Sequence, residues 1–451
     1  MNYKQARDFI TEISKYGSVY GLSSIRALME RLGNVQERLR ILHVAGTNGK
    51  GSVCAMLAAV LQAAGYRTGV YASPAVWEPE EIIKVNGQVI SQEDFAALAQ
   101  KVQAACRDLF AEGLPHPTAF EVETAIAFCF FDQQECDYVV LETGLGGASD
   151  ATNLITHPVC SILTSISMDH MALLGNTLEE IAAAKAGIIK PGCPCVSAPQ
   201  NPKAARVLAQ AAQEKGSVLR MADPSRIQVF SYDGQKSWFE ADVEPQITLY
   251  GQEKPQPAAC QERWSGTLGL TGACQKENLA CVLEVVRLLR EQGIRITRDA
   301  FLKGLAGVHL PGRMEQIGNH PDFYLDGAHN EGAAYCLRET AEHCFANRRI
   351  VFILGVFADK EYEKVLKMML PYAAAVFTIT PDHPRALDAE QLAGQARLFC
   401  QSVTSVPDLA QAAAQAEQAA GDDGVVLAFG SFSYLADLKK ARKVESRQKN
   451  G

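Results

Sequence analysis

The sequence predicts an α/β protein of two domains, and three observations lead to this prediction. Short, wholly apolar runs such as 138–141 and 425–429 recur along the chain, as is typical of buried parallel strands. Stretches with apolar residues at helical spacing separate these runs. The alternation starts afresh near residue 295 of a 451-residue chain, which is longer than one domain usually is. We therefore expect domains at 1–295 and 296–451.

The first domain is expected to alternate strands and helices after an initial helical stretch. The expected elements are a helix at 3–32, strands at 41–45, 67–72, 138–141, 159–164 and 196–198, and helices at 53–61, 93–112, 119–132, 177–187, 202–215 and 275–291. The Asn86-Gly87 pair predicts a hairpin-like turn. From about 218 to 268 the pattern changes to short alternating stretches with Gly and Pro, which predict a small antiparallel patch.

The second domain is expected to be a smaller, Rossmann-like α/β unit. Its four apolar runs lie at 323–325, 350–354, 375–379 and 425–429, with helical stretches between them. The basic tail from Lys439 onward is interpreted as the solvated end of a helix.

The loop after the first strand has the order of a phosphate-binding loop. It consists of Gly46, Thr47, Asn48, Gly49, Lys50, Gly51 and Ser52, and an apolar helix follows it. Glycines let backbone N–H groups turn toward an anion, and the helix adds the positive end of its dipole. Lys50 can place a charge at the outer phosphates, and Ser52 or Thr47 a hydroxyl at Mg²⁺. This predicts a P-loop-type parallel sheet domain. Val44 and Gly51 depart from the strict G-x-x-x-x-G-K-[ST] spelling, so a tight turn without a ligand remains the alternative.

Polar residues follow several strands of the first domain. Ser73 follows the second strand, Glu142 ends the third, and the pair Asp169-His170 follows the fourth. In open α/β sheets, ligands bind beyond the carboxyl ends of strands, and hard oxygen ligands with one imidazole suit Mg²⁺ beside phosphates. Taken singly, each residue has a structural alternative: a turn for Ser73, a capping carboxylate for Glu142 and a structural role for His170.

Lys185 lies on an Ala-rich helix, among small apolar residues. A lone Lys on a helix is usually a solvated surface residue. These surroundings instead favour a buried lysine whose charge must be neutralised or modified.

The second domain has its own polar residues at strand ends. Asp326 begins an Asp-Gly-Ala-His-Asn segment that contains His329, Lys360 follows another strand, and Arg313 lies in Pro-Gly-Arg. A turn is the structural alternative for Asp-Gly. The combination favours a cleft that faces the first domain.

The net charge and the distribution of apolar residues and cysteines argue against some classes of protein. The formal net charge of −8 argues against nucleic acid or an anionic membrane as the main partner. No apolar run approaches the ~20 residues of a membrane span, and no signal-peptide pattern begins the chain. The thirteen cysteines form no C-x-x-C pair, which favours reduced thiols. We expect a cytoplasmic protein.

Taken together, the motifs are similar to those of a known family. GTNGKGS, LETGLGG, DATN, the DH…LG.T…IA…KAGIIKPG series, PGR.E, DGAHN and DK occur in this order. The chain resembles the folylpolyglutamate synthase/dihydrofolate synthase family of the Mur ligase superfamily over roughly residues 20 to 435. Thr118-Ala119-Phe120-Glu121 also matches a helix start of that family.

The resemblance implies an ATP-dependent ligase that joins L-glutamate to dihydropteroate, to reduced folates, or to both, through an acyl phosphate. It implies that Gly46, Thr47, Asn48, Gly49, Lys50, Gly51, Ser52, Asn278, Arg313, Asp326 and His329 bind ATP. It also implies that Ser52, Ser73, Glu142, His170 and a carbamylated Lys185 hold two Mg²⁺ ions, with Lys50, Lys185, His170 and Glu142 as the catalytic set. A monomer is expected.

The sequence departs from the family pattern at several positions. Ala75 stands where the family usually has His, Ala148 where it has Arg, and Cys274 where it has His. The residues at 77–82 also differ from the family pattern. They lie in a loop that is expected to contact the pterin end of the acceptor. Two alternatives therefore stay open: a Mur-type amide ligase with a non-folate acceptor, and a non-catalytic folate- or nucleotide-binding protein.

Overall fold

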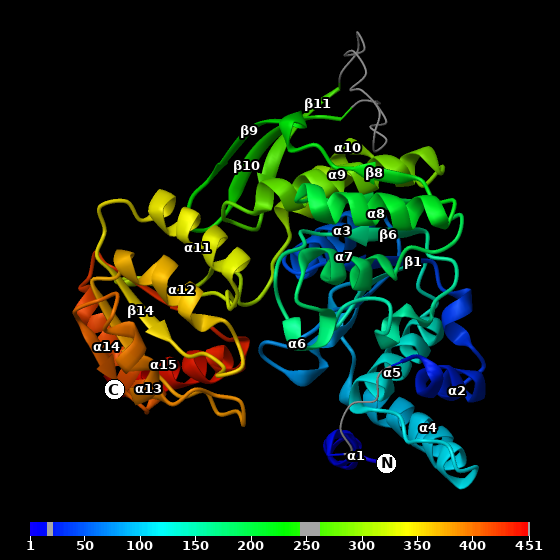
Figure 1. Cartoon of the computed structure of the whole chain (residues 1–451), viewed down its shortest axis with the longest axis horizontal. Helices are drawn as coiled ribbons and strands as arrows, with labels where there is room; N and C mark the ends of the chain where they lie inside the picture. The colour runs from blue at the N-terminus through cyan, green and yellow to red at the C-terminus, as the bar shows by residue number, and fades with distance from the viewer. Residues whose placement is uncertain (16–20, 244–261, 450–451) are drawn as a thin grey trace.

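The computed structural model describes residues 1–15, 21–243 and 262–449 and shows two α/β units side by side (Figure 1). Each unit is built around its own sheet. A small antiparallel sheet stands at one end of the first unit, on the side where the two units join. The predicted fold class is confirmed in these respects. Among the described residues, no helix has the length and apolar character needed to cross a membrane.

The first sheet is predominantly parallel and has the strand order β4-β3-β2-β5-β1-β6-β7-β8. Its strands are β1 Ile41–Ala45, β2 Thr68–Tyr71, β3 Ile83–Val85, β4 Gln88–Val89, β5 Tyr138–Glu142, β6 Cys160–Leu163, β7 Cys195–Ser197 and β8 Leu219–Met221. Only β3 and β4 run antiparallel to their neighbours, and the predicted turn at Asn86 joins them. The strands predicted for this domain are confirmed, with ends shifted by a residue or two.

Helices cover both faces of the first sheet. They are α1 Tyr3–Ser14, α2 Ser23–Arg31, α3 Lys50–Ala63, α4 Gln92–Ala111, α5 Ala119–Gln133, α6 Met171–Leu174, α7 Leu178–Ala186, α8 Pro202–Glu214, α9 Gln275–Glu291 and α10 Arg298–Ala306. Helices α1, α2, α4 and α5 share one core with the sheet, and α3, α9 and α10 share another. The prediction of a single helix over 3–32 was wrong, because α1 ends at Ser14 and α2 begins at Ser23.

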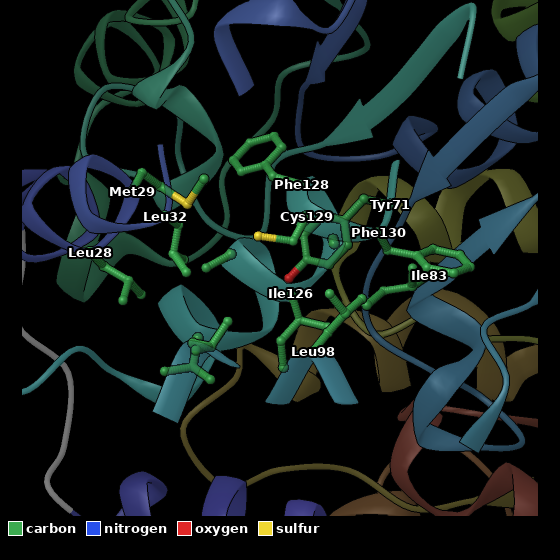
Figure 2. Packing of buried hydrophobic residues seen from close by; sticks show 14 of the residues in the cluster. Leu28, Met29, Leu32, Tyr71, Ile83, Leu98, Ile126, Phe128, Cys129 and Phe130 are labelled. Carbon is green, nitrogen blue, oxygen red and sulfur yellow. The ribbon is translucent and has the colours of Figure 1, made fainter. Parts of the chain in front are cut away.

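Figure 2 shows the core between α2, α5 and the sheet, where Met29, Phe128 and Tyr71 lie close together. The approach of α5 to the sheet is close. A Cβ on Gly69 of β2 would lie 2.7 Å from a ring carbon of Phe131, so no larger residue fits at this position. This tight packing fixes α5, and with it the Thr118 end that faces the ligand cavity described below.

The antiparallel patch is smaller than predicted. The predicted range 218–268 contains β9 Ile227–Tyr232, β10 Ser237–Asp242 and β11 Arg263–Leu268, which form a three-stranded antiparallel sheet. The first strand in the predicted range, β8, does not belong to this small sheet. It pairs in parallel with β7 and is part of the large sheet. Residues 244–261 of the prediction lie outside the described residues.

The second sheet has the order β12-β13-β17-β14-β15-β16. Its elements are β12 Glu315–Gly318, β13 Asp322–Leu325, β14 Ile350–Leu354, β15 Ala375–Thr378, β16 Val403–Ser405 and β17 Val425–Phe429, with helices α11 Glu331–Cys344, α12 Tyr362–Met369, α13 Ala389–Ala396, α14 Leu409–Ala420 and α15 Leu435–Lys449. The four predicted apolar runs are confirmed as β13, β14, β15 and β17. The edge strands β12 and β16 were missed because they are short and only partly buried.

The domain boundary at 295 stays a prediction. Helix α10 follows that position, yet it packs against α3 and adds Phe301 and Leu305 to a core of the first sheet. This packing favours a later boundary, near Val308, which is also part of that core.

His43 lies fully buried in β1, at the centre of the first sheet. The Thr152 hydroxyl is 2.5 Å from Asp150 Oδ1 and donates to it, so His43 Nε2, at 2.8 Å, donates to the Thr152 oxygen. In the described part of the chain, His43 Nδ1 has no hydrogen-bond partner. Burial, with a smaller contribution from Lys190, lowers the pKa of His43 to about 3.

This histidine makes the stability depend on pH. Its folded pKa lies below the unfolded value of about 6.5, so its contribution is present above pH 6.5 and is lost as the pH falls toward 3. Between pH 7 and pH 5 the unfolding free energy of the wild type should fall by about 2 kcal/mol more than that of His43→Gln. The amide of Gln can replace the Nε2 donor without titrating. Urea unfolding at both pH values measures the difference, and equal pH slopes for the two proteins would contradict it.

Candidate active site between the two domains

Nearly all the predicted site residues line one cavity of about 850 Å³ between the two domains. From the first domain these are Gly46, Thr47, Asn48, Gly49, Lys50, Ser52, Ser73, Glu142, His170, Lys185 and Asn278, and from the second domain Arg313, Asp326 and His329. Gly51 does not line the cavity. A Cβ on it would lie 3.6 Å from Leu310 and 3.7 Å from Glu142 Oε2, so it lies behind the loop, facing these side chains.

The loop after β1 has the geometry of an anion cradle. Gly49 caps α3 with φ 85°, a left-handed conformation that favours glycine. Its open Cα side faces the Asn278 side chain of α9, and any Cβ would collide with that amide. The loop is also anchored from behind, because Thr47 N donates to the Ser165 carbonyl at 2.8 Å. The first turn of α3 therefore presents its free N–H groups to the cavity.

Two lysines converge on one backbone carbonyl of this loop. Lys185, on α7, donates to Gly46 O at 2.7 Å, and Lys50 Nζ lies 3.2 Å from the same oxygen. Lys185 is 4% exposed. Burial, together with the charge of Lys50, lowers the pKa of Lys185 to about 7. The predicted burial of Lys185 is therefore present in the structure.

Glu142 ends β5 beside Lys50. Its Oε1 lies 3.9 Å from Lys50 Nζ, and the Ser73 backbone N–H donates to its carboxylate. Burial raises the pKa of Glu142 to about 7, although Lys50 and Arg313 oppose the shift. Its negative charge is thus only partly compensated, and a bound cation would complete the compensation.

The second domain supplies the opposite wall. The Arg313 guanidinium lies 4.5 Å from the centre of the Phe432 ring, and burial raises the pKa of Asp326 although Arg313 opposes the shift. Asp326 also accepts N–H groups from Met314 and Ala328, at 2.9 and 2.8 Å, so it orders its own loop.

A polar network joins the two walls. Asp169, after β6, accepts a bond from Lys360 at 2.7 Å and from the Asn330 amide at 3.0 Å. Asn330 also exchanges hydrogen bonds with Asn48 at 3.1 Å. Burial opposes ionisation of Asp169, yet Lys360 and His170 hold the pKa of its carboxyl well below the usual range. The loop after β1 is therefore tied directly to the second domain.

The predicted metal ligands are not arranged as a ready-made cluster. Within the described residues, no group of three or more His, Cys, Asp or Glu side chains could hold a metal ion. His170 has φ 51° and a partly exposed ring whose Nε2 lies 3.8 Å from Asp169 Oδ2. His329 directs Nδ1 to its own loop at Gly327 O, 2.8 Å away, and burial lowers its pKa to about 4.

Sequence reasoning missed several residues of the cavity. Cys336 and Phe432 line it, as do Phe357 and His383, whose rings stack with centroids 4.5 Å apart. No sequence signal identifies these residues, because none of them belongs to a recognisable motif. In the 73–82 loop, Ala75 lines the cavity, whereas Trp77 packs against the second domain under Lys439, whose Nζ lies 3.9 Å from the centre of the Trp77 ring.

Comparison with known proteins places the chain among close relatives. Residues 44–252 match the model of the Mur ligase middle domain, and residues 312–432 match that of the Mur ligase, glutamate ligase domain. The dihydrofolate synthase/folylpolyglutamate synthase of Bacillus subtilis is 35% identical over 443 residues, which cover 98% of this chain and 99% of that protein. The folylpolyglutamate synthase of Lacticaseibacillus casei is 32% identical, over 86% of this chain and 87% of that one.

Solved structures of two proteins are also similar to this chain over nearly its whole length. The folylpolyglutamate synthase of Mycobacterium tuberculosis complexed with ADP and AMPPCP superposes with a TM-score of 0.84 at 29% identity, covering 98% of this chain and 99% of that one. An Escherichia coli protein in complex with DHPP and ADP superposes with a TM-score of 0.81 at 28% identity, covering 98% of each chain.

The Asp169–Lys360 pair should couple the two domains energetically. In a double-mutant cycle of Asp169→Asn and Lys360→Met, we expect a coupling of about 1–2 kcal/mol in unfolding free energy, because each single change leaves a partly buried charge or amide without its partner. Lys364→Met on the same side of the second domain is the control. Lys364 is 45% exposed in its ion pairs, so its loss should cost less than ~1 kcal/mol. Additive effects of the two Asp169–Lys360 changes would contradict the coupling.

Proposed function

Since the chain belongs to the dihydrofolate synthase/folylpolyglutamate synthase family of Mur ligases, we propose that it joins L-glutamate to dihydropteroate, to reduced folate (poly)glutamates, or to both, at the cost of ATP. The observation that carries this proposal is the single interdomain cavity, in which a phosphate-binding loop, a buried carboxylate and a buried lysine face the second domain. These groups fit phosphoryl transfer to a carboxylate.

ATP would lie with its phosphates at the start of α3. Free N–H groups in the first turn of α3 and the Lys50 ammonium would bind the phosphate oxygens. Arg313 and His329 approach the same cavity from the second domain, and Asn278 holds the loop at Gly49. The nucleotide would thus contact both domains, and closure around it would exclude water.

The donor set also fits Mg²⁺. The Glu142 carboxylate is buried with its charge only partly compensated, and the Ser52 hydroxyl lies in the first turn of α3, as the ligand residues of such sites do. Ser73 and His170 complete the proposed ligands. Bound Mg²⁺ would neutralise phosphate charge during the transfer.

Lys185 fits the role of a carbamylated lysine. Carbamylation needs a neutral amine that attacks CO₂ with loss of one proton, and a pKa of about 7 makes the neutral amine available at physiological pH. The product is a carboxylate-like group, which replaces a buried positive charge by an anion beside the proposed metal. As a carbamate, Lys185 would no longer donate from an ammonium to Gly46 O.

The reaction then follows from the arrangement of the cavity. A carboxylate oxygen of the folate-type acceptor attacks the γ-phosphorus of ATP, ADP leaves, and an acyl phosphate forms. The amino nitrogen of glutamate attacks the acyl carbon and loses a proton, and phosphate leaves with its bonding electron pair. Lys50 and the N–H groups of the loop hold the transferred charge in place. The monomeric state and the cytoplasmic location stay predictions.

A direct assay tests the function and the choice of acceptor. With ATP, Mg²⁺ and L-glutamate, we expect phosphate release that depends on either 7,8-dihydropteroate or tetrahydrofolate, with the glutamylated product identified by mass spectrometry. Lys50→Ala should lower turnover on the order of 100-fold, since it removes a charge that stabilises the transfer. Phosphate release that requires glutamate but neither acceptor would favour a non-folate ligase, and nucleotide binding without turnover would favour a binding protein.

Carbamylation of Lys185 gives a separate prediction. Lys185→Ala should lower turnover on the order of 100-fold or more, because it removes a ligand that the metal needs. The wild type incubated with ¹³C-bicarbonate should show a carbamate carbon in its NMR spectrum, and its occupancy should fall about tenfold for each pH unit below 7 as the amine becomes protonated. Lys190→Ala is the matched control, since Lys190 is also part-buried, with its pKa lowered to about 8 by burial, but donates to Asn153 O instead. A carbamate signal that persists in Lys185→Ala would contradict the assignment.

A further inference from the structure

Two thiols meet where the domains face each other. Cys274 is the residue before α9 in the first domain, and Cys336 lies on α11 in the second domain. Both line the ligand cavity and both are partly exposed. The two thiols interact, and the segment that ends at Cys274 contacts α11 one turn from Cys336. The ligase mechanism uses neither of them.

Contacts between the 272–274 segment and α11 hold the two cysteines close to each other. The Ala273 N–H donates to Thr340 Oγ1 at 3.0 Å, and the Thr340 hydroxyl donates to the Cys336 carbonyl at 2.7 Å. A Cβ on Gly272 would lie only 3.0 Å from Thr340 Oγ1, so the 272–274 segment rests directly on α11. The approach of Cys274 to Cys336 is therefore a property of the domain contact and does not depend on side-chain orientation alone.

The two sulfur atoms are chemically unequal. The interaction with Cys336, with help from Arg313, lowers the pKa of Cys274 despite its partial burial, and the position before α9 adds the positive end of a helix. The same interaction, together with burial, raises the pKa of Cys336. Buried thiols elsewhere, such as Cys54 and Cys281, have pKa values raised by burial. A thiolate next to a second thiol is the arrangement that thiol–disulfide exchange requires.

We propose that Cys274 and Cys336 form a thiol–disulfide exchange site, which a small-molecule disulfide oxidises to a covalent link between the two domains. The Cys274 thiolate attacks one sulfur of the small disulfide, which breaks its S–S bond and expels one thiolate. The Cys336 thiolate, after losing its proton, attacks Cys274 Sγ and expels the second small thiol. Two protein thiols are oxidised, one disulfide is reduced to two thiols, and the protons pass to these thiols and to solvent.

The Cys274–Cys336 disulfide would restrain the part of the cavity that we assign to the nucleotide. Cys274 directly precedes Gln275, whose amide lies 3.5 Å from the Ser52 hydroxyl, and Asn278 one turn later contacts Gly49. A covalent bond from this segment to α11 fixes the separation of the two walls that enclose the phosphate-binding loop. Opening of the domains for ADP release is then prevented, so the oxidised protein should turn over more slowly than the reduced one.

Peptide mapping of the full-length protein tests the site without relying on activity. After treatment with oxidised glutathione at pH 7.5 and alkylation of the remaining thiols, we expect a cross-linked peptide that contains Cys274 and Cys336, and its loss on dithiothreitol treatment. ADP dissociation from the oxidised protein should be at least tenfold slower than from the reduced protein. In the Cys336→Ser variant, the reaction should end with a glutathione adduct on Cys274. The Cys274→Ser variant should give no cross-link.

The control variant is Cys344→Ser, two turns further along α11, which should cross-link as the wild type does. Circular dichroism of each variant establishes that it is folded, and the wild-type mapping decides the proposal even if a variant is not. Glutathione adducts on Cys274 and Cys336 in the wild type without a link between them would overturn the proposal. So would an unmodified pair under conditions that modify other partly exposed thiols. Inactivity of the reduced protein would count against the ligase function and would leave the mapping result unaffected.

Discussion

The Gly46 carbonyl is the point on which the site depends. Lys50 and Lys185 both donate to it, and Glu142 lies 3.9 Å from Lys50 with its charge only partly compensated. Two ammonium groups and one carboxylate are thus held close together at the carboxyl edge of a buried parallel sheet, where burial disfavours every charged form. The pKa values of Glu142 and Lys185 consequently both move to about 7. A site in this state gains stability from a bound polyphosphate and its cation, which supply the missing charges.

The packing of the first domain explains why these groups can stay so close. The strand β1 is central in the sheet and is buried on both faces, so the loop that follows it starts from a fixed position. Helices α7 and α5 bring Lys185 and Thr118 to the same edge, and α9 sets Asn278 against Gly49. The second domain closes the cavity through the Asp169–Lys360 ion pair and the Asn48–Asn330 amide pair. Its position therefore depends on polar contacts made by the same loops that would hold the nucleotide.

Some of the contacts between the domains involve residues to which the ligase reaction assigns no role. Trp77, in the loop that departs from the family wording, packs on the second domain beneath Lys439 rather than toward the cavity. Cys274 and Cys336 meet at a second point of the same interface. The interface thus carries side chains that the ligase reaction itself does not need.

The sequence by itself determined the alternation of strands and helices, the glycine-rich loop after β1 and several of the polar residues that line the cavity, because each of these is a local pattern. Apolar runs identify buried strands, and a glycine-rich turn between strand and helix identifies an anion cradle wherever the rest of the chain lies. It did not determine the break between α1 and α2, the pairing of β8 with the large sheet, or the packing of α10 on α3. Only the tertiary structure placed Asn48 against Asn330, directed Trp77 away from the cavity and brought Cys274 to Cys336. These contacts join residues far apart in the chain, and their energies depend on distance and burial that no local pattern encodes.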